Sequence, residues 1–267
     1  MSVYGFIGCG NMGSALIKSV AKKIGGNNIL LSDTNQKKIS DLSSLGYGKE
    51  STNDEIAKFA DYIVIGVKPQ MCEELLREIS LKVQEREKPV FISMAAGVSI
   101  NDLSNMLFPS AKIIRIMPNT PASVGEGMIL YSTSKNTSQE EINDFLSSFS
   151  LCGMIDPIDE KIIDAASAVS GCGPAFVFMF IQSLADAGVK CGLPRDKALL
   201  YAEQTVLGAA KLALESDEHP EKLKDAVCSP AGSTIAGVIA LENASFRGSV
   251  ESAVTASYNR TKELFTK

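Results

Sequence analysis

A glycine-rich turn near the start of the chain constrains the fold more than any other feature. The apolar run Val3–Ile7 is typical of a strand, and the pattern G-x-G-x-x-G follows it and opens a helix over Asn11–Ile24. Gly8 permits a tight turn, Gly10 lets a pyrophosphate approach the backbone, and Gly13 lets the helix pack close to the strand. The helix N-terminus favours the phosphate charge. The pattern predicts a dinucleotide site, and the alternative is a tight strand-to-helix turn without a ligand. The predicted phosphate-binding residues are Gly8, Gly10, Asn11, Met12 and Gly13.

Strands and helices alternate as far as Pro157. Tyr62–Val67 is rich in β-branched residues, as expected of a strand buried on both faces. The alternation predicts an α/β fold, with a parallel, doubly wound sheet of the Rossmann type in residues 1–157. The other predicted strands are Asn28–Ser32, Pro89–Ser93, Lys112–Met117, Gly127–Ser132 and Met154–Pro157.

The remainder, residues 158–267, contains no predicted strand. Predicted helices cover 160–169, 174–189, 195–215, 220–228, 233–242 and 246–265. The run AFVFMFIQSLADAGV is apolar around most of its circumference, so it must be buried on several sides. A domain of about 110 residues cannot easily bury such helices alone. We therefore predict an all-helical dimerisation domain that forms the core of a homodimer. The alternative is a helical domain packed only on the first domain of its own chain.

Asp33 indicates which dinucleotide is preferred. It lies 20 residues after Gly13, at the end of the second predicted strand. An acid there accepts hydrogen bonds from the adenosine ribose of NAD and repels the 2′-phosphate of NADP. Asp33 therefore favours NADH, although a threonine and two lysines shortly after it offset part of its charge. The alternative is that Asp33 caps a helix beginning near Asn35.

Loops at the carboxyl ends of later strands supply further candidates. Lys68 follows Tyr62–Val67 and can reach a cofactor phosphate or amide, the alternative being a solvated lysine. Two prolines stiffen the loop Met117–Pro121, which suits a nicotinamide pocket. The alternative is a structural turn in which Asn119 holds its own backbone. The cofactor-binding residues predicted besides the glycine turn and Asp33 are Asn53, Val67, Lys68, Pro69, Ala95, Ala96, Gly97, Asn119 and Pro121.

Composition excludes several classes of function. The net charge is −5 and no basic run appears, which argues against nucleic acid and anionic membranes as partners. The N-terminus lacks a secretory pattern, so we expect a cytoplasmic protein with reduced thiols. The six cysteines show no C-x-x-C spacing, so no metal site is expected. With His219 as the single histidine, a mechanism based on histidine proton transfer is disfavoured.

The turn 229–234 predicts a second site, for a carboxylate. Pro230 is expected to end one helix, because it lacks an N–H group. Gly232 lets a ligand approach the backbone, and Ser233 and Thr234 open the next helix, whose free N–H groups favour an anion. The alternative is an ordinary helix-turn-helix with a good N-cap.

These motifs together resemble pyrroline-5-carboxylate reductases along nearly the whole chain. The resemblance is carried, in the family's order, by GFIGCGNMG, GVKP, AAGVS, RIMPNTP, VSGCGPAF, ADAGVKCGLPR and the segment from Pro220 to Glu242. It implies reduction of the cyclic imine 1-pyrroline-5-carboxylate to L-proline with NADPH or NADH, the last step of proline synthesis. It also implies a homodimer with active sites between subunits, assembled into larger rings.

The resemblance assigns roles within the carboxylate turn. Thr234 matches the family's catalytic hydroxyl contact to the ring nitrogen. Ser233 and Gly232 would offer backbone N–H groups to the carboxylate, and Val227, Cys228 and Ser229 would form the facing wall. The chain departs from the family pattern at Asp33 and at Ala231, where a second glycine is common. We expect Ala231 to keep a negative φ and activity to be unaffected.

Two other functions compete with this interpretation. A β-hydroxyacid dehydrogenase has a similar two-domain plan, but it needs a catalytic lysine on the first long helix of the second domain. Pro174–Leu184 contains none. A regulatory homologue without activity is the other rival, and retention of Thr234 with the whole turn argues against it.

Overall fold

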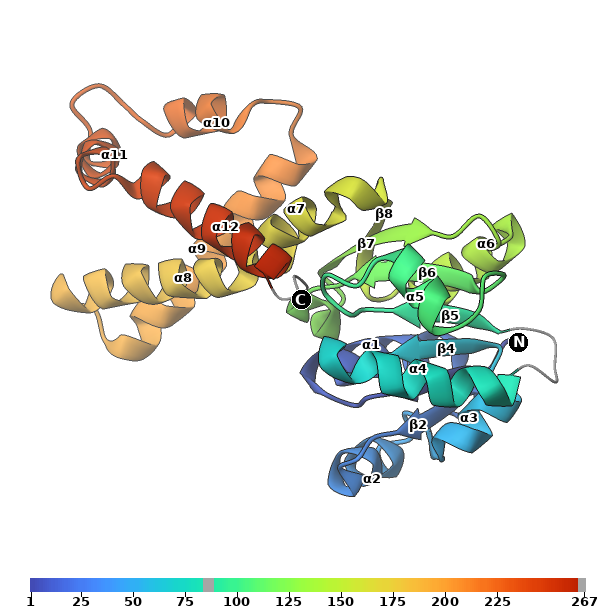
Figure 1. The fold of residues 1–267 in the computed structure, drawn as a ribbon. Coiled ribbons are helices and arrows are strands. Elements are labelled where there is room, and N and C mark those ends of the chain that lie inside the picture. Colours follow the sequence, from blue (N-terminus) through green and yellow to red (C-terminus); the bar gives the residue numbers. More distant parts are fainter. Residues whose placement is uncertain (84–88, 264–267) are drawn as a thin grey trace. The chain divides into compact units, whose positions relative to one another are not determined.

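The computed structural model describes residues 1–83 and 89–263. The chain divides into two compact units (Figure 1). Among the described residues, the first comprises Met1–Cys172 together with the last part of the final helix, from Ser257, and the second comprises Gly173–Ala256.

The first unit is built on one eight-stranded sheet, in the order β3-β2-β1-β4-β5-β6-β7-β8. Neighbouring strands are parallel except β6 and β7, which are antiparallel. The order reverses between β1 and β4, which is where ligands of doubly wound folds bind. The strands are β1 Tyr4–Ile7, β2 Ile29–Ser32, β3 Lys49–Glu50, β4 Tyr62–Ile65, β5 Val90–Ser93, β6 Lys112–Met117, β7 Gly127–Thr133 and β8 Gly153–Pro157.

Helices cover both faces of the sheet, so its central strands are apolar on both sides. In β4, for example, Tyr62 and Val64 face one core while Ile63 and Ile65 face the other. The first core contains α1 Asn11–Ile24, α2 Gln36–Ser44 and α6 Gln139–Phe149. The second contains α3 Asn53–Phe59, α4 Pro69–Val83 and α5 Ile100–Met106. Short 3-10 helices span Gly26–Asn28 (η1) and Thr120–Val124 (η2).

Three features of this unit differ from the prediction. The two-residue strand β3 is too short to produce a pattern, and α5 was missed although Ser99 and Asp102 form a capping box at its start. The antiparallel pair was also unexpected. The link from Met117 to Gly127 holds only η2, and a parallel pair would need a longer crossover.

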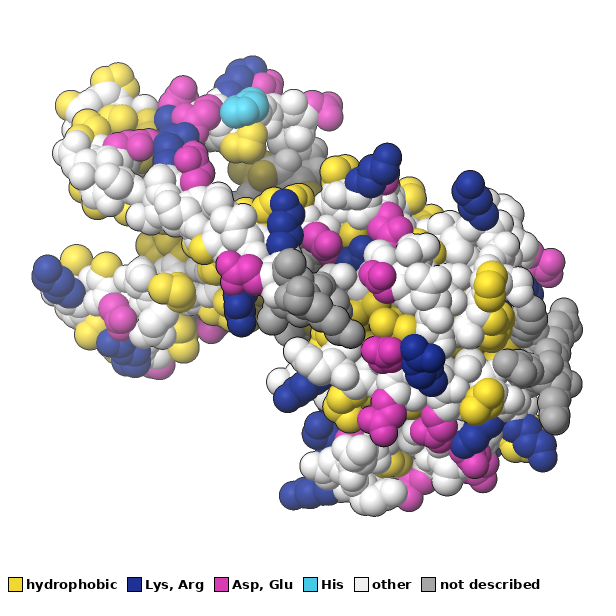
Figure 2. All heavy atoms as spheres, in the orientation of Figure 1, with side chains coloured by type: hydrophobic (Ala, Val, Ile, Leu, Met, Phe, Trp, Pro, Cys, Tyr) yellow, Lys and Arg dark blue, Asp and Glu magenta, His cyan; other side chains and the backbone are white. Residues whose placement is uncertain are grey.

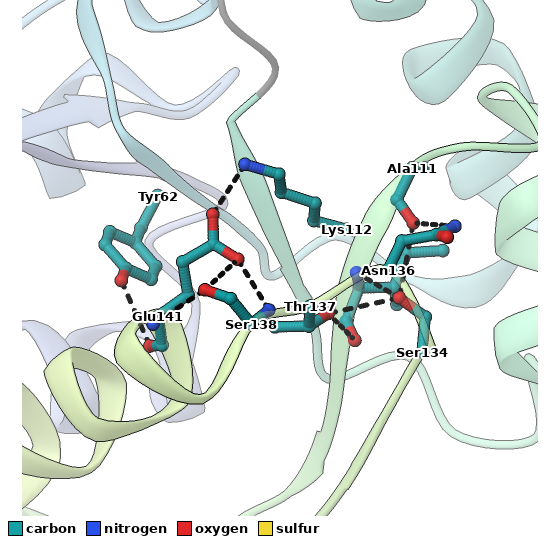
Figure 3. A network of polar contacts seen from close by, with 9 residues as sticks. Tyr62, Ala111, Lys112, Ser134, Asn136, Thr137, Ser138 and Glu141 are labelled. Carbon is teal, nitrogen blue, oxygen red and sulfur yellow. Dashed lines mark hydrogen bonds and ion pairs between the residues drawn. The ribbon is translucent and has the colours of Figure 1, made fainter.

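At the amino edge of the sheet, polar side chains bind one another (Figure 3). Ser138 and Glu141 form the capping box of α6. One oxygen of Glu141 also accepts from Lys112 Nζ at 2.6 Å, and the Glu141 carbonyl accepts from the Tyr62 hydroxyl at 3.0 Å. A groove of about 920 Å³ lies here, and no residue predicted from the sequence to bind cofactor or substrate lines it. This edge holds β4, β6 and α6 together.

The helices beyond the sheet match the predicted runs within a few residues. The end of the last predicted run, residues 264 and 265, lies outside the described residues. Our predicted domain division, 157/158, precedes α7, which belongs to the first unit. The helices are α7 Glu160–Ser170, α8 Gly173–Lys190, α9 Arg195–Glu215, α10 Pro220–Ala226, α11 Ser233–Asn243 and α12 Phe246–Glu263.

The second unit exposes many large apolar side chains (Figure 2). In α8, Phe178 is 62% and Met179 is 71% exposed, whereas the buried contact of α8 with α9 is formed by small residues such as Ala185 and Ala202. The stretch Glu160–Lys190, which includes α7 and α8, is long and apolar enough to cross a membrane by length and composition alone. An apolar surface of this extent is typical of a face that is covered by a partner.

Candidate active site

The glycine turn has the geometry that a bound pyrophosphate requires. Gly8 has φ +107°, and a Cβ there would lie 2.6 Å from the Gly66 backbone. A Cβ on Gly13 would lie 2.2 Å from the Gly8 carbonyl oxygen, whereas one on Gly10 would meet nothing within 4 Å. Gly10 is the N-cap of α1, and no side chain caps it. The helix start therefore presents free N–H groups beside open space, as predicted.

A cleft of about 970 Å³ opens beside this turn, at the carboxyl ends of β1, β2 and β4. The predicted cofactor residues that line it are Gly8, Gly10, Asp33, Asn53, Val67 and Lys68. The volume, the glycine cradle and the uncapped helix together fit a dinucleotide.

Asp33 is held against the glycine turn. One of its carboxylate oxygens accepts from the Cys9 backbone N–H at 2.6 Å, and the other accepts from the Asn35 N–H at 2.8 Å. The N-cap of α2 is Asn35, so the alternative that Asp33 caps this helix is wrong. Burial, and secondarily the Asp33 charge, raises the pKa of Cys9 to about 12, so this thiol stays protonated.

The cleft carries more carboxylates than lysines. Lys82 pairs with two of the carboxylates, Asp54 and Glu78. The charged side chains that line the cleft are Asp33, Lys38, Asp54, Lys68, Glu74 and Glu78.

The remaining predicted cofactor loops follow β5 and β6 at the same sheet edge. Ala95–Gly97 follows β5, and Asn119 follows β6. The Asn119 amide, 8% exposed, accepts from Met128 N–H at 2.8 Å and donates to the Ser170 carbonyl at 2.9 Å. It therefore links β7 to the end of α7 rather than holding its own backbone. Its contact with a cofactor stays a prediction.

The predicted carboxylate turn differs from our expectation in two ways. First, α10 ends at Ala226, so Pro230 is not the residue that stops it. Second, Ala231 has φ +57°, where we expected a negative value. The Gly232 N–H donates to the Ser229 carbonyl at 3.0 Å, which closes a four-residue turn. Pro230 is the second residue of this turn, and Ala231, with its positive φ, is the third, as in a type II turn. Proline fixes its own φ, so this turn imposes the left-handed conformation on Ala231.

The start of α11 is open to a ligand within the described chain. Gly232 is its N-cap, no side chain caps it, and Thr234 is its second residue, so the Thr234 hydroxyl is not a cap. A Cβ on Gly232 would lie 2.3 Å from Ser229 Oγ and 3.0 Å from the Ser229 carbonyl oxygen, so the glycine lets Ser229 pack closely against the start of α11. Val227 is 65% exposed, and Thr234 is also exposed. The Ser233 and Thr234 N–H groups and the Thr234 hydroxyl can therefore receive a ligand here, whereas the Gly232 N–H, which we expected to join them, bonds to the Ser229 carbonyl.

Sequence reasoning missed one charged cluster below the cofactor loops. Arg115 in β6 is buried and pairs with Glu160 and Asp164 of α7. The i, i+4 spacing of the two acids was the available signal, but the arginine partner is distant in sequence. Within the described residues, no group of three or more His, Cys, Asp or Glu side chains could hold a metal.

Comparisons with known proteins identify relatives along the full chain. A family model described as pyrroline-5-carboxylate reductase dimerisation matches residues 160–264, and one described as NADP oxidoreductase coenzyme F420-dependent matches residues 3–97. Pyrroline-5-carboxylate reductase of Pisum sativum is 38% identical over 97% of this chain and 95% of its own. Pyrroline-5-carboxylate reductase 2 of Homo sapiens is 40% identical over 99% and 84%.

A solved structure supports the same relationship. The Plasmodium falciparum pyrroline carboxylate reductase with NADP bound has a TM-score of 0.89 and 36% identity, covering 98% of this chain and 97% of that one. The helix α8 does not carry the lysine that a β-hydroxyacid dehydrogenase needs within its first long helix, because its only lysine is its last residue, Lys190.

Proposed function

The chain belongs to the pyrroline-5-carboxylate reductase family, and on this premise we propose how its residues divide the reaction. The reaction is the reduction of 1-pyrroline-5-carboxylate to L-proline by hydride transfer from NAD(P)H, the final step of proline biosynthesis. The observation that carries our assignment is the uncapped start of α11 behind a type II turn, in a chain whose other unit holds a dinucleotide cleft.

The substrate carboxylate binds the backbone N–H groups of Ser233 and Thr234, and Gly232, the N-cap, leaves the start of α11 without a capping side chain. These groups have no intrahelical partners, and the helix dipole adds to their attraction for an anion. Val227, Cys228 and Ser229 form the facing wall. A carboxylate held in this way fixes the orientation of the substrate ring, which has few other polar groups.

Thr234 acts on the ring nitrogen. When bound, reduced nicotinamide supplies the hydride that the imine carbon accepts. The C=N bond becomes a C–N bond, and the nitrogen carries the proton that the protonated imine already held. The Thr234 hydroxyl hydrogen-bonds to this nitrogen and so orients the C=N bond toward the nicotinamide. No histidine is required, which agrees with the position of His219 as the N-cap of α10, where its ring accepts from the Glu221 N–H.

Thr234 provides the test. Thr234→Ala should lower kcat by about tenfold or more, because a hydrogen bond of about 1–2 kcal/mol is lost from the transition state. Thr234→Ser should recover most of the rate. Ser233→Ala is the matched control, since only its backbone N–H is assigned a role. Turnover is measured as reduction of pyrroline-5-carboxylate at neutral pH and oxidation of L-proline at high pH. An unchanged rate in Thr234→Ala would refute the role, and no wild-type turnover with either dinucleotide would refute the function.

For the dinucleotide, we propose that this chain prefers NADH while retaining use of NADPH. The support is Asp33, whose two backbone hydrogen bonds hold it at the ribose end of a cleft rich in carboxylates. A 2′-phosphate placed there meets a fixed negative charge. Lys38 lies in the same wall and offsets part of this repulsion.

We also propose that the second unit forms a homodimer, and that dimers assemble further. The support is its exposed apolar surface within the region matched by the dimerisation model. A second copy covering α8 is our explanation for the apolar stretch Glu160–Lys190, in place of a membrane. The net charge of −5 supports the absence of a nucleic-acid partner. All six cysteines are free, which supports a reducing compartment, the cytoplasm.

A further inference from the structure

Arg115 is a buried cation that anchors α7 to the sheet. Its side chain is 3% exposed, and its Nε has no hydrogen-bond partner. Nη1 lies 3.3 Å from Glu160 and Nη2 lies 2.5 Å from Asp164. A buried guanidinium is stable only when it is paired, so these two acids fix which face of α7 meets β6.

The two acids do not have the same contacts. The described contact of Asp164 is to Arg115, whereas the same Glu160 oxygen that faces Arg115 also accepts from the Ile100 backbone N–H at 2.6 Å. Ile100 is the first residue of α5 and ends the loop that follows β5. Glu160 therefore reaches that loop, and the described contact of Asp164 does not.

A hydrogen bond at the end of this loop also restrains its middle, because the middle forms a tight turn. Gly97 has φ +76°, and the Val98 N–H donates to the Ala95 carbonyl at 3.3 Å, which closes a tight turn. Ala96 packs in a small apolar cluster that includes Ile163 of α7. The helix α7 thus bonds to the end of the loop through Glu160, and through Ile163 it belongs to the apolar cluster against which the middle of the loop packs.

We propose that Glu160 is a positioning residue for hydride transfer. Through the Ile100 N–H it holds Ala95–Gly97 in place, while Arg115 holds the Glu160 carboxylate. The inference rests on the proposed function, in which Ala95–Gly97 lines the cofactor site. Hydride transfer needs the reacting atoms within a few tenths of an ångström of their productive separation, so a small displacement of this loop slows the chemical step.

The test compares three variants, each of which removes one negative charge from the side chains that pair with Arg115. Glu160→Ala removes both the partner of Arg115 and the acceptor for Ile100. Glu160→Gln removes the charge but keeps an acceptor oxygen, and Asp164→Ala removes only a partner of Arg115. The full-length proteins are assayed with pyrroline-5-carboxylate and with NADH deuterated at the transferred position, and their thermal midpoints are measured at one protein concentration.

We expect Glu160→Ala to lower kcat by about tenfold, with a larger isotope effect, because hydride transfer becomes more rate-limiting. Its KM for the imino acid should stay within about twofold, and Glu160→Gln should recover most of kcat. Asp164→Ala should lose at least as much thermal stability and keep its kcat and isotope effect.

Two results would overturn the proposal: an unchanged kcat in Glu160→Ala, or an equal loss of kcat in Asp164→Ala. An isotope effect that stays constant while kcat falls would also overturn it, because partial unfolding lowers only the active fraction. These outcomes leave wild-type turnover intact. Failure of the proposed function would instead appear as absent turnover in the wild type.

Discussion

Replacing Ala231 by glycine should stabilise the protein, although glycine usually destabilises. Ala231 holds φ +57° in the type II turn before α11. An L-residue in the left-handed region costs about 1–2 kcal/mol, which glycine avoids. Glycine also makes the unfolded chain more flexible, which costs about 0.4–1 kcal/mol. The Ala231 side chain is exposed, so its removal loses little packing.

The net expectation is a gain of about 0.5–1 kcal/mol, equivalent to a rise of about 1–4 °C in Tm for a chain of this size. Urea unfolding and calorimetry at one fixed protein concentration measure it, because an oligomer's stability depends on concentration. Catalysis should change by no more than about twofold, because glycine adopts the same turn.

The control is the same chemical change in a helix. Ala240→Gly lies within α11, where it should destabilise by about 1 kcal/mol. Opposite signs for the two substitutions are the signature of local strain at Ala231. If Ala231→Gly destabilised as much as Ala240→Gly, the argument from φ would be wrong.

Two further predictions concern the dinucleotide cleft. Gly10→Ala should leave Tm unchanged, since a Cβ there meets nothing within 4 Å, and should raise KM for the dinucleotide by about tenfold. The control Gly8→Ala should instead lower Tm. A normal KM in Gly10→Ala would contradict a phosphate contact. Asp33→Ser should raise the ratio of kcat/KM for NADPH over NADH by about tenfold or more, because a fixed like charge is removed. Glu74→Gln removes a second carboxylate of the same cleft as a control, and an equal shift there would mean that general charge, rather than Asp33, sets the preference.

Local constraints explain why the glycine turn was predicted residue by residue. The positive φ of Gly8 and the close approach of Gly13 to the Gly8 carbonyl are local features, so a short segment of sequence is enough to predict them. The close approach of Gly66 to Gly8 is a tertiary contact that this segment does not reveal. The helix α1 was predicted with its observed bounds, Asn11–Ile24. The start of α11 at Ser233 was predicted for the same reason, because a proline and a glycine just before it restrict the chain.

The site's supporting contacts escaped prediction because their partners are distant in sequence. Asn119 was predicted to face a cofactor or hold its own backbone, but its amide bonds to residues 9 and 51 positions away. The residue type of Asn119 is compatible with all of these contacts, so the sequence does not choose among them. The packing of β7 and α7 around the side chain selects the partners.

By itself the amino-acid sequence determined the class of fold, the strand-turn-helix at Gly8–Gly13 and the start of α11, since each follows from backbone restrictions and apolar periodicity within a short segment. Only the tertiary structure decided that α7 belongs with the sheet and that Arg115 unites Glu160 and Asp164. These features arise when segments distant in the sequence pack together, because a buried charge must find partners of opposite charge.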